Sequence, residues 1–209
     1  TTMKVRNGLM EHNTGGSCAT WWWTGYYSNG HICKDGAPGG MGVYEFAGTD
    51  LEWYYKGYGE PRDFQLRTYD MNNVKTFFAN NSVIRNMIRY YPDRNDYVNV
   101  GNNVVYINVW GWDPEWKVSV KENGVELNPT RVYMKDPLHT YAYDATRVYK
   151  NSNNTYTEVL TSSNNYHLFA ANASSATSTL VIEVTDRFGN KYTETMSRPK
   201  EFAAQIENL

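Results

Sequence analysis

Short alternating segments separated by turn residues fill the second half of the chain, and this pattern constrains the fold most. Apolar and polar residues alternate on both sides of Asn123 and Gly124. An Asn-Gly pair between alternating runs favours a type I′ hairpin, because both turn residues must adopt positive φ. A similar arrangement recurs over residues 180–196. Several such strands predict an antiparallel β-sandwich over residues 103–198.

A pattern typical of a helix interrupts the strands in the middle of the chain. Asp70 is suited to cap a helix that starts directly after it, and apolar residues recur at helical spacing until Pro92 ends the pattern. Asn80 and Asn81 break the apolar face. We expect one short helical segment near residues 71–91 and no other. The predicted fold is therefore mainly β, with an antiparallel β-sandwich-like C-terminal part.

Aromatic residues are abundant, with 18 Tyr and 7 Trp, and they suit sugar-type ligands and interfaces as well as sheet faces. Trp21, Trp22 and Trp23 stand in a row. Neighbours in a strand point to opposite faces, so at least one of the three differs in environment from the others. The triplet is a stacking platform for a ligand, a contact with a neighbouring domain or subunit, or ordinary core. A hairpin is expected over residues 43–56, around a turn at 47–50.

Cysteine and aspartate residues near the N-terminus leave several interpretations open. Cys18 and Cys33 either form a disulfide, which would add about 3 kcal/mol by closing a loop of about 15 residues, or remain buried thiols. A catalytic thiol would need a nearby base, for which His12 and His31 are close in sequence. Asp35 lies in a glycine-rich loop that either approaches a ligand or makes a tight connection. Asp136 and His139 either share a site or form a structural polar contact.

Charge and motifs exclude several classes of function. A net charge of -2 gives no reason to expect nucleic acid or an anionic membrane as partner. No stretch has the apolar length of a membrane span, and the N-terminus lacks the apolar core of a signal peptide. Phosphate-binding loops, serine nucleophile elbows and zinc-protease helices have no match, and neither cysteine spacing nor histidine clusters indicate zinc. We expect no complete active site in this chain.

Eight blocks of sequence give the chain its family character. It resembles the C-terminal region of bacterial calcineurin-like metallophosphoesterases, of the type with an N-terminal β-domain, a central phosphoesterase domain and a C-terminal domain. One departure is Ala37, where the family more often has Thr. The blocks that carry the resemblance occupy residues 11–18 with the Trp cluster, 32–40, 53–56, 65–70, 108–116, 136–139, 184–190 and 198–199.

The resemblance also implies where metal ions bind. Enzymes of this superfamily hold two metal ions with Asp-x-His, Gly-Asp-x-x-Asp, Gly-Asn-His-Asp/Glu and Gly-His-x-His motifs, and two metals clamp the phosphoryl group and generate hydroxide. None of these motifs occurs in the chain, and the nearest string, at 30–33, lacks the second His. We therefore expect no metal ligand and no cofactor here. Two divalent ions and the hydrolytic activity are expected in a phosphoesterase domain upstream.

Two parts follow from the resemblance. Residues 1–57 are expected to be a hairpin-rich segment that packs on or completes the catalytic domain, and residues 58–209 an accessory domain with the helical insert and the sandwich. The segment nearest the substrate would supply ligand-binding or domain-interface residues. These candidates are His12, Asn13, Trp21, Trp22, Trp23 and Asp35.

The resulting functional expectation is a non-catalytic domain that supports the catalytic domain and substrate access. Its partner would be the upstream phosphoesterase domain of the same polypeptide, with a glycan or phosphoester as possible ligand. The alternative is a module that binds a glycan or another cell-surface ligand. Export to the periplasm or cell surface is implied by the family resemblance alone.

Overall fold

Two packed antiparallel sheets form the centre of the molecule. The computed structural model describes residues 2–14, 32–94, 97–149 and 161–202. Strands account for 42% and helices for 19%, which confirms a mainly-β fold. The first sheet has the order β5 (Leu66–Asp70), β6 (Val104–Val109), β10 (Asn165–Asn172) and β9 (Thr130–Met134). The second sheet has the order β12 (Lys191–Met196), β11 (Leu180–Thr185), β7 (Lys117–Glu122) and β8 (Val125–Glu126).

The sandwich predicted from the alternating pattern is present, but it begins earlier than residue 103. The first sheet takes its edge strand from β5, which pairs with β6 across the helical insert. Alternate residues of both sheets meet in one core, in which Trp116 and Tyr192 stack with ring centroids 6.3 Å apart. At the β7–β8 hairpin, Asn123 (φ 51°) and Gly124 (φ 80°) adopt the expected positive φ angles.

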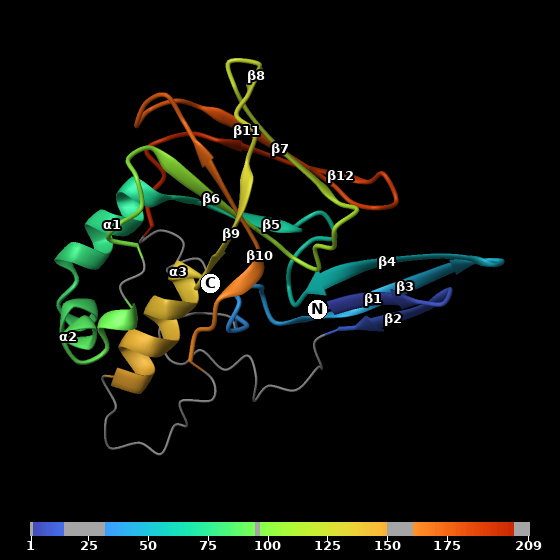
Figure 1. The fold of residues 1–209 in the computed structure, drawn as a ribbon, viewed down its shortest axis with the longest axis horizontal. Coiled ribbons are helices and arrows are strands. Elements are labelled where there is room, and N and C mark those ends of the chain that lie inside the picture. Colours follow the sequence, from blue (N-terminus) through green and yellow to red (C-terminus); the bar gives the residue numbers. More distant parts are fainter. Residues whose placement is uncertain (1, 15–31, 95–96, 150–160, 203–209) are drawn as a thin grey trace.

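Helices cover the face of the first sheet that points away from the second sheet (Figure 1). The helical segment expected near 71–91 is confirmed as α1 (Met71–Asn80) and α2 (Ser82–Tyr90). Asp70 caps α1 by accepting the Asn72 N–H at 3.2 Å. The interruption lies where the sequence places it, and Asn81 caps the second helix by accepting two backbone N–H groups.

A further helical element corrects the expectation of a single one. Helix α3 (Pro137–His139) continues into a π-helix, Thr140–Tyr149. Asp136 caps α3 by accepting the His139 N–H at 3.0 Å, and Pro137 at the first turn is compatible with helix initiation. The segment escapes a search for apolar periodicity because it buries polar residues, among them Asp144 and Thr146. Among the described residues, no helix has the length and apolar character needed to cross a membrane.

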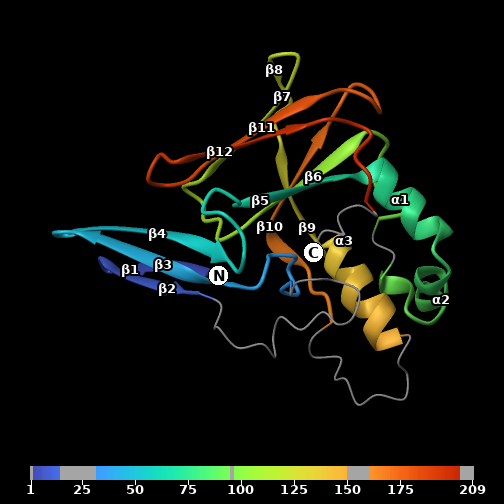
Figure 2. The same ribbon diagram turned by 180° about the vertical axis from the view of Figure 1, so that it is seen from behind.

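Two hairpins project together from one side of the sandwich (Figures 1 and 2). One consists of β1 (Thr2–Arg6) and β2 (Leu9–Asn13), and the other of β3 (Gly40–Ala47) and β4 (Asp50–Gly57). We call these four strands the hairpin arm. The β3–β4 hairpin was predicted from the sequence. The β1–β2 hairpin was not, although its turn carries the same Asn-Gly signal, with positive φ at both residues.

Candidate functional site

The structure places the candidate residues in two separate regions. His12 and Asn13 lie on β2 in the hairpin arm, whereas Asp35 lies in the loop that leads into β3. The Trp21–Trp23 triplet and Cys18 are outside the described residues, so the expectations attached to them stay predictions. The two regions have different partners in the sandwich.

His12 lies in an aromatic cluster at the root of the hairpin arm. Its ring centroid is 5.1 Å from that of Trp53 and 5.6 Å from that of Tyr44. Its Nδ1 is 2.9 Å from the Tyr44 hydroxyl oxygen. Burial lowers the pKa of His12, which favours the neutral ring at pH 7. Asn13, the next residue, is exposed.

Trp53 joins this cluster to the sandwich. Its ring meets Phe188 edge to face, with centroids 4.7 Å apart, and the Arg187 guanidinium lies 5.3 Å from the Trp53 ring centroid. Arg187 is held in turn by two bonds to Asp113, at 2.9 and 3.0 Å, and by Glu115. Cation–π and edge-to-face contacts of this kind are each worth about 1 kcal/mol. The root of the arm is therefore fixed to the loops of the sandwich.

Large apolar side chains lie uncovered on the outer part of the arm. Leu9 is 74% exposed and Phe46 72% exposed, and each lies next to the turn of its hairpin. Both turns point away from the sandwich (Figure 2). By strand register, Val5 and Leu9 point to opposite faces of the first hairpin, and Met41 and Phe46 point to opposite faces of the second. The exposed apolar residues of the arm are Val5, Leu9, Met41, Tyr44 and Phe46.

Asp35 belongs to a tight loop, residues 32–40, that lies against the first sheet. Within the loop, the Cys33 N–H donates to the Ala37 carbonyl at 2.7 Å. The amides of Asn108 and Asn165 donate to the Asp35 carbonyl at 2.7 and 3.2 Å. Backbone and side-chain bonds thus make this glycine-rich stretch a tight connection.

The Asp35 carboxylate pairs with a histidine that the sequence did not single out. Asp35 Oδ2 is 3.1 Å from His167 Nε2, and the other nitrogen of that ring, Nδ1, is 2.7 Å from Asn108 Oδ1. Burial raises the pKa of Asp35, but the bond and charge of His167 outweigh it and hold this pKa well below its usual value. The carboxylate is therefore ionised.

A β-bulge brings His167 to this position. The register of β10 against β9 passes from Asn165 opposite Met134 to Leu168 opposite Val132, so β10 has one extra residue. Asn165 and His167 consequently both contact the loop. Tyr166 points elsewhere and stacks on Tyr133, with ring centroids 4.3 Å apart. No local sequence signal marks such a bulge.

Beneath the loop lies Asp136, which is fully buried. Its Oδ2 accepts hydrogen bonds from the Tyr69 hydroxyl at 2.7 Å and from Asn108 Nδ2 at 2.9 Å. Burial raises the pKa of Asp136. The His139 ring turns to the Ser162 hydroxyl, 2.7 Å away, and burial lowers the pKa of His139 to about 3. Asp136 and His139 therefore make a structural contact through the helix cap.

The family was identified by comparison with known proteins. The sequence model described as the C-terminal of calcineurin-like phosphoesterase matches residues 11–192. The chain belongs to this family. No curated protein and no solved structure matches it significantly. The matched stretch runs from β2 to β12, so one family unit includes most of the hairpin arm and both sheets.

Neither region of this phosphoesterase C-terminal domain assembles a metal centre from the residues that the structure describes. In that part of the chain, no group of three or more His, Cys, Asp or Glu side chains is placed to hold an ion. Cys33 Sγ lies 3.8 Å from the Pro38 carbonyl oxygen. Cys18 is outside the described residues, so the structure does not test whether the two cysteines form a disulfide or remain thiols.

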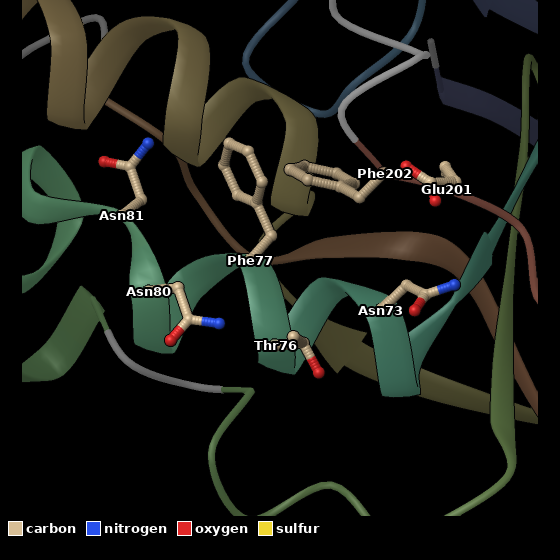
Figure 3. Close-up of a pocket in the computed structure, with 7 residues that line it drawn as sticks. All are labelled: Asn73, Thr76, Phe77, Asn80, Asn81, Glu201 and Phe202. Atoms are coloured by element: carbon tan, nitrogen blue, oxygen red, sulfur yellow. The ribbon is translucent and has the colours of Figure 1, made fainter.

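A groove of about 430 Å³ lies between α1 and the C-terminal segment of the domain (Figure 3). Asn73, on its wall, donates to the Lys200 carbonyl at 2.9 Å, and Asn81 is occupied by capping α2. Figure 3 shows Thr76 and Asn80 pointing away from the Phe77 ring. The polar groups of the groove do not converge on one point, so it does not have the character of a binding site.

Proposed function

We propose that this chain is a non-catalytic accessory domain of a calcineurin-like phosphoesterase, and that its hairpin arm packs on or completes the catalytic domain of the same polypeptide. The observation that carries the proposal is the exposure of Leu9 and Phe46 near the turns of the arm. Hydrolysis and the two divalent metal ions then belong to the phosphoesterase domain. The accessory domain contributes stability and supports substrate access.

The arm is built to present a surface at a fixed angle. Its root is held by Trp53, Phe188 and Arg187, whereas Leu9 and Phe46 have no cover in the described structure. Burying one such side chain stabilises a contact by about 2 kcal/mol. In the family, the phosphoesterase domain precedes the C-terminal domain. In this order the catalytic domain lies on the N-terminal side of β1, which supports contact through the arm.

The test uses the full-length protein that contains both domains. We expect Leu9→Ser with Phe46→Ser to lower the melting temperature of the phosphoesterase domain and to increase amide exchange in the arm. Val125→Ser is the matched control, because Val125 is 66% exposed at the β7–β8 hairpin, remote in sequence from the arm. If the double variant behaves like Val125→Ser, the arm is not the docking surface.

Location outside the cytoplasm is part of the proposal and is supported by the family resemblance. An oxidising compartment would also permit a disulfide between Cys18 and Cys33, which is one of the two states that the sequence leaves open. Fractionation of the native host, followed by thiol labelling of the purified protein, tests both points. A cytoplasmic protein with two reactive thiols would contradict them.

One observation favours glycan binding as a second candidate function. Tyr133 and Tyr166 are 53% and 62% exposed and stack on each other beside the edge of the first sheet. Exposed aromatic rings with polar tips suit the apolar faces of sugars. We expect Tyr133→Ala with Tyr166→Ala to abolish retention on a polysaccharide affinity gel, whereas Tyr91→Ala, an exposed tyrosine after α2, leaves it unchanged. Equal retention of all three proteins excludes a site at the pair.

A further inference from the structure

The hydrogen bonds around Asn108 determine whether Nδ1 of His167 carries a hydrogen. Asn108 Nδ2 donates to the Asp35 carbonyl at 2.7 Å, and a backbone carbonyl can only accept. This contact fixes the orientation of the amide. Asn108 Oδ1 therefore faces His167 Nδ1 at 2.7 Å as an acceptor, and Nδ1 must carry a hydrogen.

The second ring nitrogen of His167 faces another acceptor. Nε2 lies 3.1 Å from Oδ2 of Asp35, and the other oxygen of this carboxylate accepts the Ala37 N–H at 3.1 Å. An ionised carboxylate only accepts, so Nε2 must also carry a hydrogen. Both nitrogens donate only in the imidazolium form. A neutral ring with its proton on Nδ1 would direct a lone pair at the carboxylate.

We infer that Asp35 and His167 form a proton-operated clasp, which fastens the loop 32–40 to the first sheet while His167 is charged and loosens when the ring loses its proton. The bond that breaks is the one between His167 Nε2 and the Asp35 carboxylate. The bond between Nδ1 and Asn108 persists, because Nδ1 keeps its hydrogen. This inference adds a pH response that the proposed function does not require.

Charged groups surround the clasp on several elements. Lys34 and Asp35 belong to the loop, and Arg67 on β5 donates to the Gly36 carbonyl at 2.6 Å. Asp136 reaches His167 only through Asn108. Among the described residues, Tyr55 and His139 also interact electrostatically with Asp35, and Cys33 belongs to the same loop. In the described structure, Asp35 provides the sole acidic contact of the His167 ring. Breaking this contact therefore acts directly on the loop that carries Asp35.

The loop contacts the root of the hairpin arm, so loosening the loop affects that root. The loop runs into β3, and its Pro38 carbonyl accepts the Tyr55 hydroxyl of β4 at 2.6 Å. Asn165 and Arg67 still hold the loop backbone when the clasp opens. We therefore expect increased local opening of residues 33–37 and no global unfolding. Because histidine titrates near pH 6.5 in unfolded chains, stabilisation by the charged ring is complete below about that pH and is lost above it.

Nitrogen-15 NMR of the imidazole rings in the intact chain tests the protonation state. We expect both His167 nitrogens to carry hydrogens at pH 6, and loop amide exchange, corrected for its intrinsic rate, to rise by up to about tenfold per pH unit as the ring loses its proton. A neutral His167 ring at pH 6 would overturn the inference.

Two variants separate the clasp from a general pH effect. His167→Gln removes the titration, so loop opening becomes independent of pH between 6 and about 8. His12→Gln, in the arm, keeps the response of the parent protein. Equal pH dependence in both variants contradicts the clasp. If His167→Gln does not fold, the ring NMR of the unmodified chain decides by itself. Neither result depends on docking through Leu9 and Phe46.

Discussion

Gly36 in the loop lies directly against the buried carboxylate of Asp136. Its φ is +85°, and an added Cβ would lie 2.1 Å from Asp136 Cγ. Glycine is therefore required both by the backbone angle and by the space. Gly48, at the β3–β4 turn, shares only the first requirement, since its φ is +66° and nothing lies within 4 Å of an added Cβ.

These two glycines predict different losses. Gly48→Ala is expected to cost about 1–2 kcal/mol, the strain of a left-handed alanine. Gly36→Ala adds a clash with a buried network, and we expect it to cost about 4 kcal/mol or more. Urea unfolding followed by circular dichroism measures both free energies. Similar losses for the two variants would show that the loop moves away from Asp136 without penalty.

Individual site residues were only partly predictable. Asp35 stands out because glycines surround it, and the structure places it at the centre of the loop contacts. His167 and Asn108 do not stand out, because their contact with Asp35 depends on chain folding over long sequence separations and on a bulge. His12 was singled out within a family block, and its Trp53 and Tyr44 neighbours come from the other hairpin.

At the scale of elements, the helical segment that starts at Pro137 contains two buried groups with opposite responses to pH. Burial lowers the pKa of His139 to about 3. The unfolded value is near 6.5, so stability falls as the pH drops below about 6.5. Burial raises the pKa of Asp144 to about 6, and its bonds to Ser162 and Arg94 offset this only in part. Stability therefore falls as the pH rises from about 4 to about 6.

The two slopes oppose each other between pH 4 and 6, each at most about 1.4 kcal/mol per pH unit. His139→Gln leaves the Asp144 slope, so this variant should gain stability on acidification in that window. Asp144→Asn leaves the His139 slope and should lose stability. Unfolding midpoints at four pH values between 4 and 7 measure both. If stability depends on pH with the same slope in the parent protein and in both variants, His139 and Asp144 do not make opposing contributions.

Elements with one exposed and one buried face were predictable. Helices α1 and α2 show apolar spacing and an asparagine break, and the Asn123–Gly124 turn imposes its own geometry. The helix from Pro137 was missed because its buried face includes Asp144 and Thr146, which satisfy their hydrogen bonds inside the protein. The strand β5 lies outside the range predicted for the sandwich, because its place there depends on pairing with β6 across the helical insert.

The whole molecule consists of a sandwich with helices on one side and an arm on another (Figure 1). Trp53 carries the aromatic contact from the arm to Phe188 and the cation–π contact to Arg187. We expect Trp53→Ala to increase amide exchange throughout β1–β4 while exchange in β6, β10 and β11 stays unchanged. Phe46→Ala, at the tip, should leave the isolated chain unaffected. A uniform increase over both sheets would mean that arm and sandwich unfold together.

The extra residue in β10 has a consequence for comparing related domains. Side-chain direction at position 167 is set by the number of residues between Asn165 and Leu168. If one residue between Asn165 and Leu168 were removed, side chains would alternate strictly between the two faces of the sheet. The single residue left between them would then point away from the loop, so a histidine there could not contact Asp35. Relatives that lack the proton response should therefore differ from those that have it by a single-residue gap in this stretch. The length of this stretch should predict the proton response better than the presence of a histidine at the aligned position does.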